Sequence, residues 1–410
     1  MVGSVDIMDN KANIDTINNG GKSTEVRLKK AISIEGFLCL AAFIGFFTII
    51  SIKMGFINSI NTLLNTSFDL LMNTVFYIMA IAVVAGGIAS ILTEFGVIAL
   101  ANRALSPLMG PIYGLPGASA ISVFTTYLSD NPAVLTLADD IRFRRYFKKY
   151  QLPALTNIGT AFGMGMIVTV YMMGLPNPNN ENFILAAIIG NIGAIIGSIV
   201  SVRLMLIKTK KIYGTSLEAE ENGHITYDIL EYREVREGTI GERLMNSMLE
   251  GGASGVKVGF DIIPGVLIIC SVVMILTNTI PESGVYTGAA FEGIGFLPWI
   301  GEKISFIIKP LFGFTSPTGI SVPITALGAA GAAIGLVPTM ITNGLARAHD
   351  VAVFTAMCMC WSGYLSTHVA MMDGLKFRNL TGAAIFAHTI GGICAGVAAN
   401  WIFRLVEMIL

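Results

Sequence analysis

The residues best placed for chemistry form a short polar cluster, Ser129, Asp130 and Asn131, which follows an apolar stretch and precedes Pro132. Proline favours the first position of a helix, and Ser, Asp and Asn are good helix N-caps, so the cluster predicts the tip of a helical hairpin. Free carbonyls of one helix and the positive end of the next then point to one place. Asp130 adds a charge that is costly in a bilayer and functional there by default. We expect this tip to replace the hydration shell of a solute or cation; the alternative is a capping cluster on an exposed turn.

Polar side chains also recur inside two long apolar stretches, which begin near residues 152 and 351. Asn157 and Thr160 are three positions apart and share a helix face, and two serines of the second stretch are four apart. These groups could line a central cavity, although Ser and Thr in membrane helices often bond back to their own backbone and a buried histidine can be structural. The candidates are Thr156, Asn157, Thr160, Ser362, Ser366 and His368.

The elements that must position these residues are membrane helices. Of 410 residues, 53% are hydrophobic and 13% are charged, whereas a soluble chain has about 25% charged residues. So little charge cannot cover a soluble globule of this size. The composition excludes a disordered chain and a disulfide-stapled domain, and a net charge of −1 provides no field that would attract a nucleic acid. Walker, HExxH and GxSxG motifs are absent, so we predict that the protein is not an enzyme.

Seven stretches are long and apolar enough to cross a bilayer, which takes about 20 residues. They cover residues 33–53, 70–93, 152–175, 183–207, 257–277, 351–373 and 381–406. Two more apolar stretches, 105–140 and 305–340, are broken by Gly and Pro and predict re-entrant helical hairpins, which are tolerated only inside protein or beside a water-filled cavity. The expected fold is an all-α polytopic membrane protein with about seven transmembrane helices and two re-entrant hairpins.

Basic residues indicate the orientation of the chain. Arg142, Arg144 and Arg145 follow the first hairpin, whereas the loop 176–180 contains no Lys or Arg. With the N-terminus inside, the basic clusters face the cytoplasm, as the positive-inside rule requires. Residues 1–30 are too long and too acidic for a signal peptide and predict a disordered cytoplasmic tail. We therefore predict an integral protein of the cytoplasmic membrane, with its N-terminus in the cytoplasm and its C-terminus outside.

The two hairpins belong to an internal repeat with an offset of 199 positions (310 − 111 = 199). The matches include Pro111 with Pro310, Ile-Ser-Val at 121–123 with Ile-Ser-Val at 320–322, Thr126 with Thr325, and Gly193 and Gly197 with Gly392 and Gly396. Each copy holds three crossings, so the second copy is inverted in the membrane, an architecture typical of transporters. The expected segments are the tail (1–30), an extra N-terminal transmembrane helix (31–68), a first repeat (69–207), a charged cytoplasmic loop (208–250) and a second, inverted repeat (251–410).

The second hairpin tip, expected within 326–333, contains only Ala, Leu and Gly. Binding there would rely on backbone groups, and a small, close-packed gate is the more natural interpretation. Thr126 and Thr325 occupy matching places in the two hairpins. We therefore add both threonines to the residues that are candidates for binding a solute or an ion.

The order of hairpin, broken span, amphipathic lead-in, hairpin and broken span resembles the concentrative nucleoside transporters and, more broadly, the nucleoside-recognition gate-domain family, which includes spore-maturation membrane proteins. The tip 129–133 and the segment 246–269 carry this resemblance, which spans residues 70–410. It implies two opposed hairpins that clasp a solute, coupling to sodium or protons, a sodium ion near Asp130 and Asn131, and a homotrimer. The chain departs from that family's pattern with Ser-Asp-Asn at its first tip and Ala and Gly at its second.

The combined prediction is a secondary active transporter for a small polar solute, with a nucleoside or a related solute as the first candidate. It would work by alternating access between two opposed hairpins, within a lipid bilayer. We expect no cofactor beyond a sodium ion and no nucleic-acid partner. The alternative is a non-transporting gate-domain membrane protein with a role in assembly, sporulation or signalling.

Overall fold

The computed structural model describes residues 13–16, 24–27, 30–129, 133–219, 227–281 and 283–409. The chain divides into two compact units, Met1–Ser59 and Ile60–Leu410. In the first unit, strands β1 (Asn13–Thr16) and β2 (Thr24–Arg27) pair antiparallel. The apolar helix α1 (Ile34–Met54) leaves most of its side chains exposed, as a helix that faces lipid would. The described part of the predicted tail, 1–30, thus contains a strand pair.

From α2 onward the regular elements are helices. Those before the charged loop are α2 (Phe56–Asp69), the π-helix η1 (Leu70–Val75), α3 (Phe76–Glu94), α4 (Val97–Tyr113), α5 (Ser119–Leu128), α6 (Ala133–Asp139), α7 (Ile141–Arg144), α8 (Ala154–Ala161), α9 (Gly165–Met173) and α10 (Phe183–Tyr213). Those that follow are α11 (Ile240–Pro264), the π-helix η2 (Gly265–Cys270), α12 (Ser271–Thr277), α13 (Phe296–Lys303), α14 (Ser305–Phe312), η3 (Pro317–Ile320), α15 (Ser321–Ala326), α16 (Ala330–Thr342), α17 (Ala348–Cys360), α18 (Tyr364–Gly374), η4 (Arg378–Leu380) and α19 (Thr381–Ile409).

Within the described residues, six helices are long and apolar enough to cross a membrane: Ile34–Met54, Phe56–Glu94, Ala154–Met173, Phe183–Tyr213, Ile240–Thr277 and Arg378–Ile409. Six of the seven predicted spans fall on these helices. Two predicted spans are interrupted: the span over 152–175 is divided into α8 and α9 at residues 162–164, and the span over 351–373 is divided into α17 and α18 at residues 361–363. Gly363 has a φ of +59°, which ends the helical path there. The all-α polytopic membrane fold is confirmed.

The backbone conformation shows the same repeat of 199 positions as the sequence. Gly114 follows the last residue of α4 and Gly313 the last residue of α14, both in the left-handed conformation, and these glycines are 199 positions apart. Met164 and Gly363, again 199 apart, precede α9 and α18 in the same conformation. The hairpins are α5 with α6 and α15 with α16, and their tips fall where we predicted them. Between α5 and α6 the structure describes only Ser129, and the predicted tip residues Asp130 and Asn131 lie outside the described residues; the second tip is residues 327–329.

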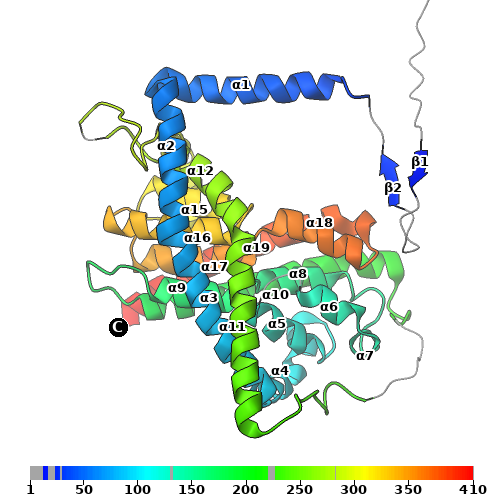
Figure 1. Cartoon of the computed structure of the whole chain (residues 1–410). Coiled ribbons are helices and arrows are strands. Elements are labelled where there is room, and N and C mark those ends of the chain that lie inside the picture. Colours follow the sequence, from blue (N-terminus) through cyan, green and yellow to red (C-terminus); the bar gives the residue numbers. More distant parts are fainter. Residues whose placement is uncertain are drawn as a thin grey trace, which may run out of the picture. The chain divides into compact units, whose positions relative to one another are not determined.

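Two antiparallel helix pairs form the frame, and glycines let each pair approach closely. Helices α3 and α11 cross with Gly86 against Gly251 and with Gly255 against Ala82 (Figure 1). A Cβ atom at Gly255 would overlap the backbone of Ala82 and Val83, which no side-chain motion can relieve. Small residues are common where helices pack against each other in membranes, because they let the two backbones approach closely.

The second pair, α10 and α19, uses the glycines of the repeat. Gly197 packs against Gly391 and Ala395, and a Cβ atom at either glycine would overlap the backbone of the other helix. These two helices, together with α8 and α17, enclose the main buried core, which is rich in alanine and methionine. The glycine-rich composition therefore reflects backbone-to-backbone packing.

Gly255→Ala tests whether α3 and α11 need this close approach. The added methyl group must separate two backbones, so we expect a loss of about 1–3 kcal/mol of stability, seen as a lower melting temperature in detergent. Gly241→Ala in the same helix is the matched control, because nothing lies within 4 Å of its would-be Cβ. The control should be neutral or gain about 0.5–1 kcal/mol. Equal melting temperatures for the two variants would contradict the packing argument.

Candidate functional site

Each repeat contains one interrupted helix, and the interruptions mark the candidate site. In the first repeat α8 ends at Ala161 and α9 begins at Gly165; in the second, α17 ends at Cys360 and α18 begins at Tyr364. A break leaves carbonyls at the end of one helix and N–H groups at the start of the next. In membrane transporters such discontinuous helices supply backbone groups and helix-end charge to a bound solute.

Each break packs against the hairpin of its own repeat. The Gly363 N–H donates to the Ala326 carbonyl at the end of α15 (3.0 Å). Gly165 lies against the ring of Tyr127 in α5, so closely that a Cβ atom there would overlap the ring. Tyr127 and Ala326 are 199 positions apart, so matching positions of the two hairpins touch the two breaks, through a side-chain ring in the first repeat and a backbone hydrogen bond in the second. The hairpin and the broken helix of each repeat therefore form a single structural unit.

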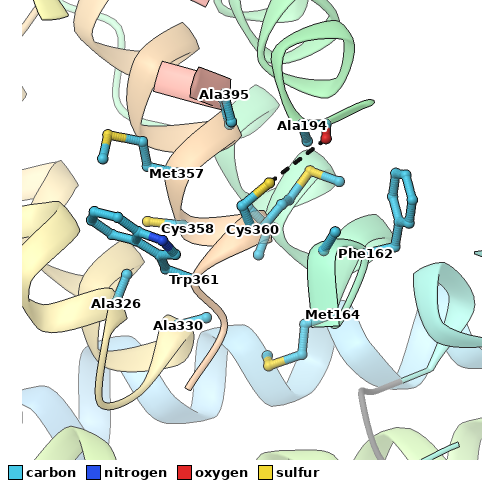
Figure 2. Close-up of a cluster of buried hydrophobic side chains, with 14 of the residues drawn as sticks. Phe162, Met164, Ala194, Ala326, Ala330, Met357, Cys358, Cys360, Trp361 and Ala395 are labelled. Atoms are coloured by element: carbon cyan, nitrogen blue, oxygen red, sulfur yellow. Dashed lines mark hydrogen bonds between the residues drawn. The ribbon is translucent and has the colours of Figure 1, made fainter. Parts of the chain in front are cut away.

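The space between the two breaks is filled by apolar side chains. Phe162 and Met164 from the first break approach Cys360 of the second break, with Trp361 on its other side (Figure 2). All four side chains are less than a tenth exposed. The Cys360 thiol donates to the Ala194 carbonyl of α10 (3.6 Å). In this conformation the breaks meet in a buried, apolar cluster, which offers little to bind a polar solute.

A buried polar network lies next to this cluster and joins both repeats. Asn157 Nδ2 donates to Ser201 Oγ (2.8 Å) and to the Ala384 carbonyl (3.0 Å). The Ser201 hydroxyl lies 3.0 Å from His388 Nδ1, and His388 Nε2 hydrogen-bonds the Cys360 carbonyl at the second break. Asn157, Ser201 and His388 are fully buried. The network thus ties α8, α10 and α19 to the point where α17 ends.

These bonds assign the proton on each buried imidazole. His388 must donate from Nε2, because its partner there is a carbonyl oxygen, so Nδ1 accepts from Ser201. His368 donates from Nδ1 to the Tyr364 carbonyl (2.9 Å), which leaves a lone pair on Nε2. No donor among the described residues reaches that atom, although the side chain is fully buried. The two rings lie 4.8 Å apart between centroids.

The residues predicted for the site fall into three groups. Thr156, Asn157 and His368 belong to the buried network or border it. The hydroxyls of Thr126, Thr160 and Thr325 bond to carbonyls of their own helices, at 2.7–2.8 Å. Thr160 also faces the sulfur of Met371 in α18. Ser129 lines a cavity and Ser362 is buried at the second break. Asp130, Asn131 and the Ser366 side chain lie outside the described residues.

The cavity beside the first hairpin has a volume of about 640 Å³, within the usual range of about 300–1,000 Å³ for small-molecule sites. Thr125, Leu128 and Ser129 of the hairpin line it, together with Asn102 of α4. The Asn102 Oδ1 atom is buried and has no hydrogen-bond partner among the described residues. Thr125 and Asn102 were missed from the sequence, where an amide or hydroxyl in a helix gives no sign of which side it faces.

Two other cavities can be compared with the one beside the first hairpin. A cavity of about 320 Å³ beside the second hairpin is lined by Thr74, Gly335 and Thr339, among others. A wider one of about 770 Å³ is lined by Glu181, Arg347 and further residues, but by no residue of either hairpin tip. Among the described residues, no group of three His, Cys, Asp or Glu side chains could hold a metal ion. The cavity at the first hairpin is therefore the best candidate for a solute.

No protein-family model matches the sequence, and no curated protein matches it. Solved structures do match: those of CNTnw, a concentrative nucleoside transporter. CNTnw in an inward-facing substrate-bound state is 12% identical with a TM-score of 0.50, covering 89% of this chain and 84% of that chain. A doubly substituted CNTnw in an outward-facing state is 12% identical with a TM-score of 0.51, covering 90% and 86%.

A singly substituted CNTnw in an intermediate state is also 12% identical, with a TM-score of 0.50 and coverage of 90% and 86%. The likeness extends over most of both chains, so it concerns the whole arrangement and not one helix bundle. This chain has the fold of those structures. What it carries or does with that fold is a separate question, argued from its own residues.

Ser201→Ala tests the network that joins the repeats. Removal of one hydroxyl leaves buried groups on Asn157 and His388 without partners, so we expect a loss of about 1–3 kcal/mol of stability. Thr209→Val is the matched control in the same helix, since Thr209 is equally buried and bonds only to carbonyls of its own helix. Melting temperatures in detergent compare the two. A loss for Thr209→Val as large as that for Ser201→Ala would refute a special role for the network.

Proposed function

We propose that the protein is a secondary active transporter for a small polar solute, with a nucleoside or a related solute as the first candidate. The observation that carries the proposal is the doubled unit of hairpin and broken helix. One copy places Ser129 and Thr125 on a cavity of about 640 Å³, which the Asn102 side chain also lines; its Oδ1 has no hydrogen-bond partner among the described residues. The second copy is inverted by the odd number of crossings in each repeat.

Alternating access between the two hairpins is the proposed mechanism. Inward-facing, outward-facing and intermediate states are described for CNTnw, whose fold this chain shares. Each hairpin here is attached to its own broken helix, so a hairpin and its break would move together. A solute bound beside one hairpin would then change its exposure when one unit shifts against the frame of α3 and α11.

The coupling ion is proposed to bind at the first tip. Asp130 supplies a carboxylate and Asn131 an amide oxygen, the hard oxygen ligands that a sodium ion prefers, and Ser129 adjoins them. Protons are the other candidate driving ion, with His368 Nε2, to which no described residue donates, as an acceptor. We place the protein in the cytoplasmic membrane with the N-terminus in the cytoplasm, and a homotrimer remains the expectation from the resemblance.

Uptake by proteoliposomes tests Asp130. With a sodium or a proton gradient imposed, Asp130→Asn should lower the rate of coupled uptake by about tenfold or more, the effect of losing a ligand interaction worth about 1.4 kcal/mol. Asp261→Asn is the control, because Asp261 is an exposed carboxylate on α11. Undiminished uptake by the Asp130 variant would remove this residue from the site.

Thermal stability in detergent tests whether a solute binds at all. A nucleoside panel is added with and without sodium chloride, and a bound solute at 100 times its Kd should add about 2.7 kcal/mol of stability. If neither nucleosides, related polar solutes nor sodium shift the melting temperature, and uptake is absent, the non-transporting alternative replaces the transporter proposal.

A further inference from the structure

The segment 227–239, which we call the strap, lies against the cavity of the first hairpin. Residues of the strap line this cavity together with Thr125, Leu128 and Ser129 of the hairpin. The strap residues that do so are Tyr227, Ile229, Tyr232, Arg233, Glu234 and Arg236. From the sequence this stretch is a charged loop between helices, yet here it forms part of the wall of the candidate solute site.

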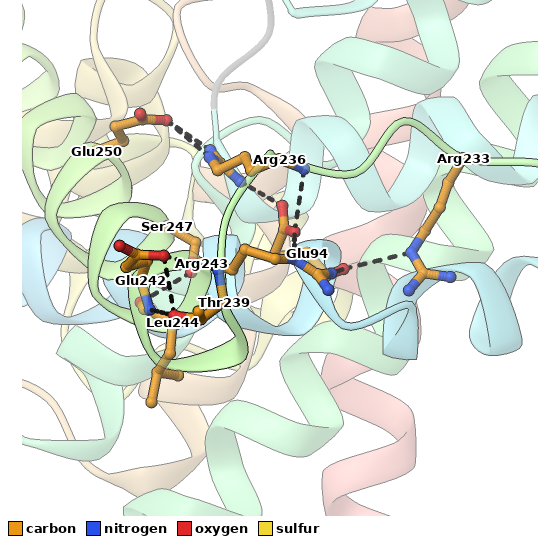
Figure 3. Close-up of polar contacts among 9 residues, drawn as sticks. All are labelled: Glu94, Arg233, Arg236, Thr239, Glu242, Arg243, Leu244, Ser247 and Glu250. Carbon is orange, nitrogen blue, oxygen red and sulfur yellow. Dashed lines mark hydrogen bonds and ion pairs between the residues drawn. The ribbon is translucent and has the colours of Figure 1, made fainter.

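One end of the strap is fastened to the frame helices. Arg236 pairs with Glu94 at the end of α3 (2.6 Å) and with Glu250 of α11 (2.5 Å) (Figure 3). Arg233 Nε donates to the backbone carbonyl of Glu94 (3.3 Å). The Glu94 side chain is 3% exposed and also accepts from Arg243 of α11 (2.7 Å). Glu94 therefore keeps one guanidinium partner even when Arg236 leaves it.

Asp228 and Glu234 fasten the strap to the segment that follows the first hairpin. Asp228 pairs with Arg145 (2.9 Å) and accepts from the Tyr146 hydroxyl. Glu234 pairs with Arg142 (3.1 Å), which is itself held by Asp140 at the start of α7 (2.8 Å). The hydrogen bonds from Tyr227 and Arg142 lower the pKa of Glu234, which favours its charged form. The strap thus links α3 and α11 to α7 across the cavity.

We propose that the strap is a releasable restraint that holds the cavity of the first hairpin in its narrow form and slows its opening. Any motion that separates the hairpin and α7 from α3 and α11 must break the pairs of Arg236 or those of Asp228 and Glu234. In three of the four strap pairs both side chains are 26–76% exposed, so each of these three pairs is weak and screened by salt. Release of the strap therefore costs little free energy. The buried carboxylate of Glu94 keeps its pair with Arg243.

The regulatory meaning of the strap rests on the proposed transport function, but access to the cavity does not, and access is what the experiment measures. Thr125→Cys places a thiol on the cavity, in a background where Cys39 and Cys394 are replaced by Ser and the three remaining cysteines are buried. Maleimide labelling in detergent then reports how often the cavity opens, because labelling of a transiently open state tracks its population.

Arg236→Gln releases the strap from α3 and α11, and Glu234→Gln releases it from α7. Each should speed labelling at Thr125→Cys by about two- to fivefold, the change in an opening equilibrium when a partly exposed ion pair is lost. Raising KCl from about 0.1 M to about 1 M, at constant sodium, shortens the Debye length from about 10 Å to about 3 Å. This change should speed labelling of the intact strap more than labelling of either variant.

The matched controls separate a local effect from a general loosening. Glu237→Gln removes an adjacent charge for which no partner is seen among the described residues, and it should leave labelling unchanged. Thr339→Cys beside the second hairpin should label at the same rate with and without the strap variants. Unchanged labelling at Thr125→Cys in both strap variants, with unchanged melting temperatures, overturns the proposal. Equal acceleration at Thr339→Cys overturns it as well, whether or not the protein transports a solute.

Discussion

The structure depends on one constraint: backbone groups freed by a helix break must find partners inside the protein, because lipid offers none. The chain breaks two membrane-depth helices, at residues 162–164 and 361–363. At the second break the Gly363 N–H reaches a carbonyl of α15 and His388 reaches the carbonyl of Cys360. The hairpins supply some of these partners and the buried network supplies others. A hairpin without its break, or a break without its hairpin, would leave peptide groups unpaired.

This constraint also explains the composition. A frame that holds two broken helices in place needs rigid neighbours, and α10 and α19 provide them through direct backbone contact between Gly197 and Gly391. Such contacts rely on dispersion and close fit, since lipid removes most of the hydrophobic driving force between helices. The low charge fraction and the high glycine content are therefore two results of the same environment. What little charge remains is concentrated where helices leave the bilayer and in the strap.

Much of the fold could be predicted from the sequence because it is local or repeated. Pro132 and its polar neighbours marked the first tip, small residues marked the second, and the offset of 199 positions related them. The division of α17 from α18 was not foreseen at its actual position, since Trp361 and Ser362 carry no breaking signal and Gly363 alone is one glycine among many. Met164 adopts the left-handed conformation without being glycine, and sequence patterns do not reveal such a residue.

The contacts of the candidate site were harder to foresee. The bond between Ser201 and His388 joins residues 187 positions apart, and that between Arg236 and Glu94 joins residues 142 apart. Periodicity shows which face of a helix is apolar but does not reveal which distant polar group completes a pair. Asn157 was selected for its residue type, yet its amide is taken up by the network, whereas Asn102 was overlooked and faces the cavity.

The conformation shared by Met164 and Gly363 has a different energy in the two halves. Glycine adopts it freely, while another L-residue is raised by roughly 1–2 kcal/mol. In a protein built from two identical inverted copies, the two opposed conformations would be counterparts with equal free energy. One methionine in place of one glycine lifts that degeneracy, because any motion that straightens the first break relieves strain that the second break does not carry. The two breaks therefore differ in backbone energy, although the two halves of the chain follow the same backbone plan.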